Sequence, residues 1–305
     1  MCFSWLLQCL SLGKNGVKMI MQEEFERSLL ENLKVLSLCL GTDGFEYEIL
    51  EQVPNIEKLV VCDGSLKEML CCESPNNVDY SELLLQLKEL YLESLPELVA
   101  WRLPFSNLTC LKVESCDSLP YLFTSSTAKS LTQLQRMEIK ECESIEEIVS
   151  KEESDEDEII FPQLTCLKVN NCPSLSYLFT SSTARSLGQL QRMEIKKCKS
   201  IEEIVSKEES DEDQIMFPRL RSLNLENLKK LTRFYRGSLS FPLLEELSIT
   251  VCNEMVSLCA GTLKAAKLLQ VTIDEEEDIL LETDLNSTLM KEFQLKKVRV
   301  VLLKI

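Results

Sequence analysis

The residue types best suited to chemistry in this chain are carboxylates, and they are densest in a stretch that occurs twice. The sequence SIEEIVSKEESDED spans residues 144–157 and again residues 200–213. Clustered carboxylates can bind divalent cations or transfer protons, but an EF-hand loop needs a glycine at its turn, and EESDEDE has none. A retaining glycosidase holds two carboxyls about 5 Å apart across a cleft, whereas adjacent loop carboxylates repel each other and stay hydrated. We therefore expect a solvated acidic loop, in which Ser154 and Ser210 are candidate phosphorylation sites because each precedes Asp-Glu-Asp.

Nucleophilic and phosphate-binding chemistry also lacks its usual residues. Histidine is absent, so neither a Ser-His-Asp triad nor a Cys-His pair can form. The fourteen cysteines include no CxxC, and without histidine a zinc site needs an all-cysteine set that no spacing supports. Neither GxxxxGKS/T nor GxGxxG occurs, and there are only eight glycines. The sequence thus predicts a protein that is not an enzyme, has no catalytic residues, and holds neither a metal nor a cofactor.

The charge balance indicates which partners the chain avoids. Its 305 residues carry 33 basic and 50 acidic side chains, which gives a net charge of −17. Such a charge opposes binding to nucleic acids and to anionic membrane surfaces, and no apolar run approaches the ~20 residues that span a bilayer. Cysteines spread over a chain of this length favour small buried thiols in a reducing compartment over a disulfide framework. We expect a cytoplasmic protein that binds neither nucleic acid nor membrane.

The acidic stretch belongs to a longer duplication, which indicates what positions it. Residues 105–160 and 161–216 align without gaps and are identical at 44 of 56 positions, so these two blocks are tandem copies. Inside each block a shorter pattern, LxxLxLxxC, recurs, and in the first block it starts at Leu108 and again at Leu134. The same frame runs through the whole chain with a mean spacing of about 26 residues. Its twelve starts lie near residues 7, 33, 56, 87, 108, 134, 164, 190, 220, 244, 268 and 295.

This frame predicts one short strand per unit. The fourth and sixth residues are apolar and alternate with polar neighbours, as in a strand that buries one face. One such strand cannot bury its apolar side alone, so copies stacked every ~20–29 residues build a parallel sheet over a continuous core. We expect the chain to turn inward at the ninth position of the unit. That position holds Asn15 in the first unit and a cysteine in five others, namely Cys116, Cys142, Cys172, Cys198 and Cys252.

The segments between the strands must return along the opposite face of the array. In the first half of each duplicated block, LFTSSTAKSLTQL offers Ser125, Ser126 or Thr127 as the cap of a short helix. In the second half, the spacing of Ile145 and Ile148 predicts that both point inward. The carboxylate run follows these isoleucines, so we place it in a loop on the outer face.

These units resemble a known family. The LxxLxLxxC frame, the stretch FPQLTCLKVNNCPSLSYLFTSSTARSLGQLQRMEIKKCKSIEEIV and the Phe-Pro pairs that begin at residues 161, 217 and 241 are similar to part of the plant intracellular immune receptors. That part is the leucine-rich-repeat region of the coiled-coil/nucleotide-binding/leucine-rich-repeat (NBS-LRR) disease-resistance proteins, and the resemblance runs from about residue 7 to residue 305. It implies an α/β repeat fold, a leucine-rich-repeat solenoid or horseshoe of about twelve irregular repeats. A parallel sheet would line its concave face, and short helices and loops its convex face.

The resemblance also implies a function and a limit. In that family the repeats take part in innate immunity by binding a pathogen effector, a guarded host protein or the receptor's own nucleotide-binding domain. This chain lacks the family's phosphate-binding loop, switch motifs and N-terminal coiled coil, so we expect a single repeat array over residues 1–305 without a nucleotide-binding domain. Its first and last units have no polar cap of the kind that terminal repeats need. We therefore expect a fragment or truncated relative of a larger receptor.

The candidate partner-binding residues are the third, fifth and seventh residues of successive units, which line the concave face of a horseshoe. They hold six basic and four acidic side chains, an excess of positive charge in an acidic chain. From residue 112 to residue 194 the fifth position reads Lys-Glu-Lys-Glu across strands ~4.8 Å apart, which predicts a cross-strand charge ladder. The candidates are Lys112, Glu114, Arg136, Glu138, Lys140, Lys168, Arg192, Glu194, Lys196, Asn224 and Glu226.

Two other classes of repeat protein stay open as alternatives. The substrate-recognition domains of ubiquitin ligases, and other cytosolic leucine-rich-repeat scaffolds, also use LxxLxLxxC units. An F-box segment, however, would have to fit into residues 1–32. Secreted or receptor-type arrays favour Asn-rich turns with GxIP spacing and need a signal peptide, whereas residues 7–15 already follow the repeat frame. A recognition module of plant defence is the interpretation that the sequence favours.

Overall fold

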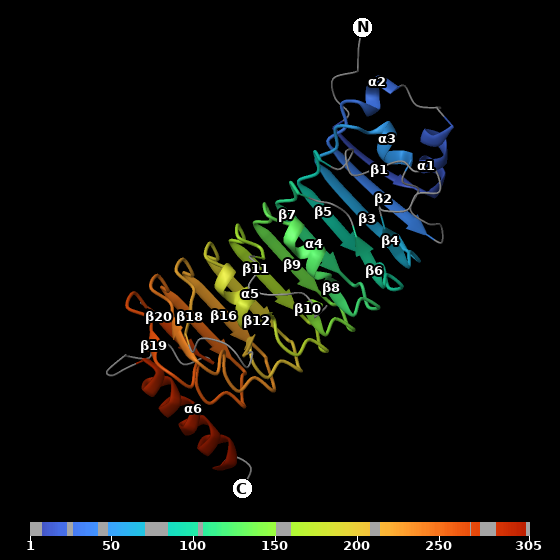
Figure 1. The fold of residues 1–305 in the computed structure, drawn as a ribbon. Coiled ribbons are helices and arrows are strands. Elements are labelled where there is room, and N and C mark those ends of the chain that lie inside the picture. The colour runs from blue at the N-terminus through green and yellow to red at the C-terminus, as the bar shows by residue number, and fades with distance from the viewer. Residues whose placement is uncertain are drawn as a thin grey trace.

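In the computed structural model, eleven parallel strands lie side by side along an elongated array (Figure 1). The structure describes residues 8–22, 27–41, 48–70, 85–102, 106–150, 160–207, 214–268, 270–274 and 285–302. The order of the strands across this main sheet follows their order along the chain. The strands are β1 (Cys9–Gly13), β2 (Val35–Gly41), β3 (Lys58–Gly64), β5 (Glu89–Glu93), β7 (Cys110–Glu114), β9 (Arg136–Lys140), β11 (Cys166–Asn170), β13 (Arg192–Lys196), β16 (Ser222–Glu226), β18 (Glu246–Thr250) and β20 (Gln270–Ile273).

These strands occupy the positions that the repeat frame predicts. β7, for example, runs from the third to the seventh residue of its unit, and the fourth and sixth residues, Leu111 and Val113, are fully buried. Neighbouring strands pair in register, so that Leu111 lies opposite Met137 of β9 and Met137 lies opposite Leu167 of β11. The buried rows join into one hydrophobic core that runs through the array. The leucine-rich-repeat fold expected from the sequence is therefore confirmed.

A residue with left-handed backbone conformation turns the chain at the end of most of these strands. The eighth position of eight consecutive units has φ between 52° and 56°, at Asp63, Ser94, Ser115, Glu141, Asn171, Lys197, Asn227 and Val251. In the central units its N–H donates to a carbonyl of the next strand, as from Ser115 to Lys140 at 3.0 Å. The ninth residue then points inward, and all five cysteines at that position are buried. The first unit differs, because Asn15 lies on helix α1 and is exposed, so its expected inward turn was wrong.

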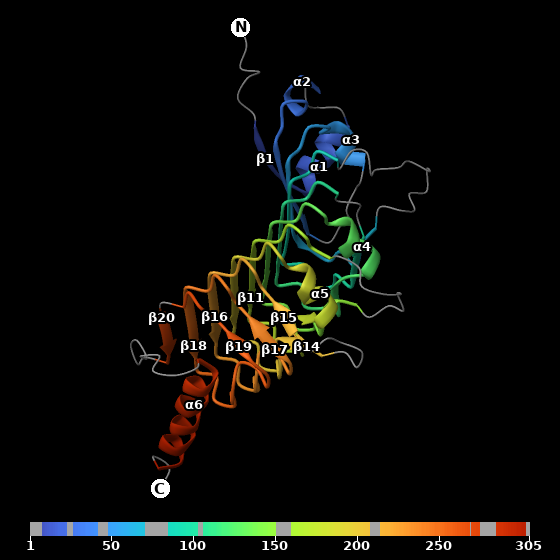
Figure 2. The same cartoon turned by 60° about the vertical axis from the view of Figure 1, so that its left-hand side comes forward.

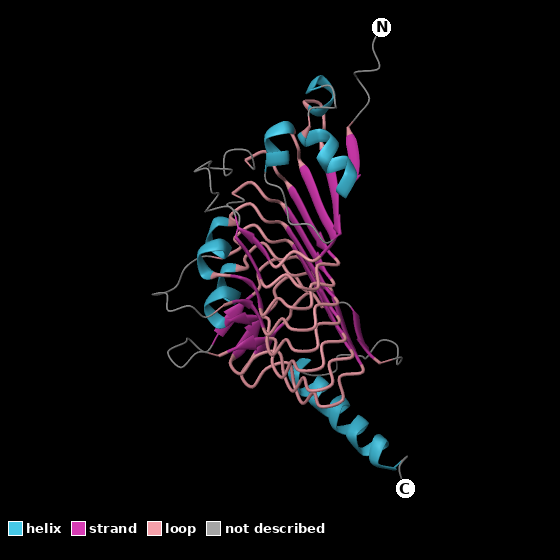
Figure 3. Ribbon diagram, turned by 90° about the vertical axis from the view of Figure 1, so that its right-hand side faces the viewer, coloured by secondary structure: helices cyan, strands magenta, loops and turns pink. Residues whose placement is uncertain are grey.

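The opposite face of the array carries short helices, loops and short strands (Figures 2 and 3). The helix expected in the duplicated blocks is present as α4 (Ser125–Ser130) and α5 (Ser181–Ser186). Thr124 caps α4 and Thr180 caps α5, because each threonine is the last extended residue before its helix. The cap of α4 is therefore not one of the three predicted residues. The other helices are α1 (Lys14–Met21), α2 (Arg27–Leu30), α3 (Glu48–Gln52) and α6 (Leu285–Leu302).

Small parallel sheets on this face were not predicted. Each strand of these sheets has only two or three residues, which is too short to leave a periodic pattern in the sequence. The small sheets are β4 (Glu68–Leu70) with β6 (Ala100–Arg102), β8 (Tyr121–Phe123) with β10 (Glu147–Val149), β12 (Phe179–Thr180) with β14 (Val205–Ser206), and β15 (Gln214–Met216) with β17 (Ser238–Ser240) and β19 (Leu263–Lys264).

The strand expected from residue 295 was wrong, because that segment belongs to helix α6. Leu285, Leu289 and Phe293 are spaced four residues apart and are buried, and α6 lies against β19. The leucines and valines of this segment fit both a strand frame and a helix, and the buried stripe at intervals of four residues decides in favour of the helix. Among the described residues, the main sheet thus has eleven strands instead of twelve. None of the described helices is long and apolar enough to cross a membrane.

Candidate protein-binding surface

The candidate partner-binding residues lie together on one surface of the main sheet. The third, fifth and seventh residues of each unit form this surface, which we call the sheet face, while the fourth and sixth residues of the unit are buried beneath it. The parallel register places Lys168 of β11 between Glu138 of β9 and Glu194 of β13. All eleven candidates belong to five neighbouring strands, β7, β9, β11, β13 and β16. The structure therefore brings them onto one continuous surface.

Charged side chains on the sheet face pair both along a strand and between strands. Lys140 Nζ lies 2.6 Å from Glu138 Oε1, and Lys196 Nζ lies 2.8 Å from Glu194 Oε1. The fifth and seventh residues of a unit lie on the same strand and project to the same side about 7 Å apart, so their long side chains can meet. Of the expected Lys-Glu-Lys-Glu ladder along the fifth position, the charge of Lys168 helps lower the pKa of Glu194 across strands, after the larger effect of the hydrogen bond from Lys196. The register aligns those four residues, but within the described part of the chain they form no ion pairs with one another.

Lys112 is the most firmly neutralised basic residue on this surface. Its ammonium lies 2.8 Å from a carboxylate oxygen of Glu93 and 2.7 Å from one of Glu114. Partial burial opposes the charge of Lys112, but hydrogen bonds to Glu114 and Glu93 outweigh the burial and raise the pKa of Lys112. Lys112 Nζ also lies 5.8 Å from the centre of the Tyr91 ring. This part of the sheet face has little charge left to offer a partner.

The three strands that follow β7 in the sheet, β9, β11 and β13, carry an excess of positive charge. We define the central basic patch as the charged sheet-face residues of β9, β11 and β13, which are five basic and two acidic. They are Arg136, Glu138, Lys140, Lys168, Arg192, Glu194 and Lys196. Within the described residues, Lys168 and Arg192 form no ion pair, and Arg136 approaches only Glu89, at 3.8 Å. The patch is positive within a chain of net charge −17.

The surroundings of the patch are acidic along the array. β5, on its N-terminal side, presents Glu89 and Glu93 at the third and seventh positions, and β16 and β18 present Glu226 and Glu246 on its C-terminal side. Lys196 also contacts Glu226 at 3.0 Å, and hydrogen bonds to Glu194 and Glu226 raise the pKa of Lys196. The sheet face thus has a positive centre between two negative margins.

Two sets of cysteines differ in their surroundings. Those at the ninth position are buried and each donates to a backbone carbonyl, as from Cys142 Sγ to Lys140 O at 3.2 Å. Burial raises the pKa of Cys142 to about 11, which makes it a poor nucleophile. Cys39 and Cys62, in contrast, lie on the sheet face of β2 and β3, and sequence reasoning missed them. The signal that could have found them is that both occupy the seventh position of consecutive units.

Two of the sequence-based predictions fall outside the described residues. Ser154 and Ser210, the candidate phosphorylation sites, and the carboxylate runs around them lie in residues 151–159 and 208–213. The isoleucines that precede the first run, Ile145 and Ile148, are both fully buried as expected.

Comparisons with known proteins place the chain in a family. Residues 6–143 and 144–275 match the family of RPS2-like plant disease resistance proteins, leucine-rich repeats. The chain is 22% identical over 234 residues to the "Probable disease resistance protein At5g63020" of Arabidopsis thaliana, and the match covers 76% of this chain and 21% of that protein. The chain therefore spans about a fifth of the length of that curated relative. The leucine-rich repeat domain of the type III effector XCV3220 (XopL) is similar at 15% identity, over 88% of this chain and 76% of that one, with a TM-score of 0.46.

The family match and the curated relative agree with the resemblance seen in the sequence, which is thereby confirmed. The matched residues include every strand of the main sheet. The chain belongs to the RPS2-like leucine-rich-repeat family of plant disease resistance proteins.

Proposed function

We propose that this chain is a recognition module of plant innate immunity that binds a protein partner through the central basic patch. The observation that carries the proposal is an ordered surface of positive charge in an acidic chain, with Lys168 and Arg192 outside any ion pair among the described residues. The partner would present an acidic segment. In plant defence, such a partner would be a pathogen effector, a guarded host protein or the receptor's own nucleotide-binding domain. The chain would bind this partner without catalysing a reaction.

The geometry suits a partner that is read by charge. Cys166 lies between Arg136 and Arg192 in the register of the sheet, so the two guanidinium groups flank a small side chain and can reach up from both sides. Arginine binds carboxylates in a two-pronged geometry and is enriched at the centres of protein interfaces. Negative margins beside a positive centre would repel a misplaced acidic partner and set its position along the array.

The experiment tests the patch with a charge-matched control. A full-length Arg136→Glu/Arg192→Glu variant and a Lys199→Glu/Lys230→Glu variant carry the same net charge, but only the first alters the sheet face, since Lys199 and Lys230 are exposed beyond the strands. Each is expressed in plant tissue with a proximity-labelling enzyme fused to it. We expect proteins labelled by the wild-type chain to be lost with the arginine variant and kept with the lysine variant. Equal labelling by both variants would remove the central basic patch as the binding surface.

A further inference from the structure

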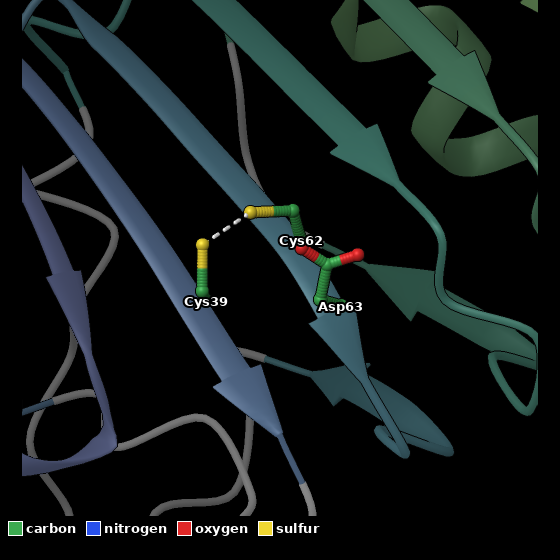
Figure 4. A group of neighbouring side chains, drawn as sticks. All are labelled: Cys39, Cys62 and Asp63. Atoms are coloured by element: carbon green, nitrogen blue, oxygen red, sulfur yellow. Dashed lines mark hydrogen bonds between the residues drawn. The ribbon is translucent and has the colours of Figure 1, made fainter.

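Two cysteines face each other on the sheet face, far from the central basic patch. Cys39 and Cys62 are register partners on the adjacent strands β2 and β3, and their sulfur atoms lie 2.9 Å apart (Figure 4). Both side chains are half-buried, so one side of the pair is open to small molecules in solvent. The carboxylate of Asp63 lies next to the pair, with its nearest oxygen within 4.8 Å of both sulfur atoms.

We propose that Cys39 and Cys62 are a thiol-oxidation site, at which a peroxide converts the two thiols into a reversible cross-strand disulfide. Adjacent strands of a sheet lie about 4.8 Å apart, which falls within the Cα separation of about 4.4–6.8 Å that a disulfide requires. Because the two sulfurs already converge between paired strands, closing the bond needs no rearrangement of the backbone. This inference does not depend on the proposed partner or on the central basic patch.

The chemistry balances with the peroxide as the only oxidant. One thiol loses its proton, and the resulting thiolate attacks the peroxide. The O–O bond breaks, a sulfenic acid forms, and the hydroxide that leaves takes up the released proton to become water. The sulfur of the second cysteine then attacks the sulfenic sulfur, so that the S–S bond forms and a second water leaves. In sum, two thiols and one hydrogen peroxide give one disulfide and two waters. Burial, the hydrogen bond with Cys39 and the neighbouring Asp63 raise the pKa of Cys62 to about 12.

Other described cysteines lack this combination of contact and access. Cys110 and Cys166 also lie on the sheet face, but β9 with Arg136 separates their strands. Cys172 and Cys198 lie on adjacent units and contact each other, but both are fully buried. Among the described cysteines, oxidation should therefore select Cys39 and Cys62. The disulfide would join the second and third strands of the array and restrict their separation.

The test uses the full-length wild-type chain and trypsin. After treatment with hydrogen peroxide, remaining thiols are blocked with iodoacetamide and the chain is digested without reductant. Cys39 is the only cysteine in the peptide 35–58, and Cys62 is the only one in the peptide 59–67, so a linked pair of these peptides identifies the bond. We expect this linked pair to dominate among the disulfide-linked peptides and to disappear on adding dithiothreitol. In the intact oxidised chain, the disulfide should raise the thermal unfolding midpoint by about 5 °C.

Variants and a denatured control keep the result open to contradiction. Cys39→Ser should abolish the linked peptide, and Cys110→Ser should leave it unchanged. The proposal is overturned if both peptides are recovered alkylated after peroxide. It is also overturned if the folded chain gives the same mixture of pairings as the chain oxidised in urea. A metal site would be indicated instead by two results together. Zinc chloride would protect both thiols from iodoacetamide, and peroxide would give no linked peptide.

Discussion

The two duplicated blocks, residues 105–160 and 161–216, repeat the same main-sheet strands and helix in their described residues but differ in electrostatics. Each has a sheet strand followed by a capped six-residue helix, and the capping hydrogen bond measures 3.3 Å in both. Yet Lys112 lies against two carboxylates, whereas its equivalent, Lys168, forms no ion pair with any described residue. Near-identical sequences therefore give one positive charge that is neutralised and one that is available.

The difference comes from the neighbouring strands as much as from the block itself. At the seventh position, Glu114 of the first block becomes Asn170 in the second, which removes one partner of the lysine. The preceding strand offers Glu93 to the first block but Lys140 to the second. The buried positions recur in both blocks because the sequence recurs, whereas the ion pairs on the surface depend on the residues of the adjacent unit. A duplication can thus change the surface charge without a new fold.

The largest expected effect tests whether the core is truly repeated. Leu111 and Leu167 occupy the same fourth position and are both fully buried. We expect Leu111→Ala and Leu167→Ala to lower the free energy of unfolding by about 3 kcal/mol each, because each leaves a similar cavity. Urea denaturation followed by circular dichroism measures both. A difference of more than ~2 kcal/mol between the two variants would show that packing is not copied between the blocks.

The helix caps give the next effect. Thr124 and Thr180 accept hydrogen bonds from the N–H groups of Thr127 and Thr183. Replacing either cap by alanine should lower the free energy of unfolding by about 1 kcal/mol, since a helix N–H loses its acceptor. The same denaturation assay applies, and a cost confined to one block would break the equivalence of α4 and α5.

The eighth position sharpens the comparison at the backbone. Ser115 has φ of 54° and its equivalent Asn171 has φ of 56°. Asparagine tolerates this conformation better than serine, so Ser115→Asn should stabilise the chain by about 0.5 kcal/mol and Asn171→Ser should destabilise it by a similar amount. Thermal unfolding of the two variants checks the opposite signs. Shifts of the same sign would mean that side-chain contacts, and not backbone conformation, decide at this position.

The smallest effect concerns the titration of Lys112. Glu114→Asn should lower the pKa of Lys112 towards its ordinary value, as measured by NMR of the ammonium group. Because the folded pKa of Lys112 is raised, its stabilising effect is complete below the unfolded pKa of about 10.4 and is lost as the pH rises through the folded value. For a surface pair we expect less than ~1 kcal/mol. An unchanged pKa of Lys112 in the first variant would contradict the ion-pair assignment.

The repeat frame predicted the parts of the fold that depend on local burial. Eleven of the twelve expected strand positions follow from apolar residues at the fourth and sixth places, and this pattern specifies their register. It failed at residues 285–302, where strand and helix spacings overlap and only the buried stripe of Leu285, Leu289 and Phe293 decides. Along the sheet face it located the charged residues but not their pairing. Pairing depends on rotamers and on the facing strand, which no single unit encodes.

The most direct test of the account is to ask which face of the array touches the partner. A photo-activated cross-linking amino acid is placed at residue 168, in the centre of the central basic patch, or at residue 129, on helix α4 of the opposite face. Each full-length chain is irradiated in plant tissue, and adducts are separated by mass. We predict a discrete protein adduct from position 168 and none from position 129. An adduct from position 129 alone would contradict the claim that the sheet face is the recognition surface.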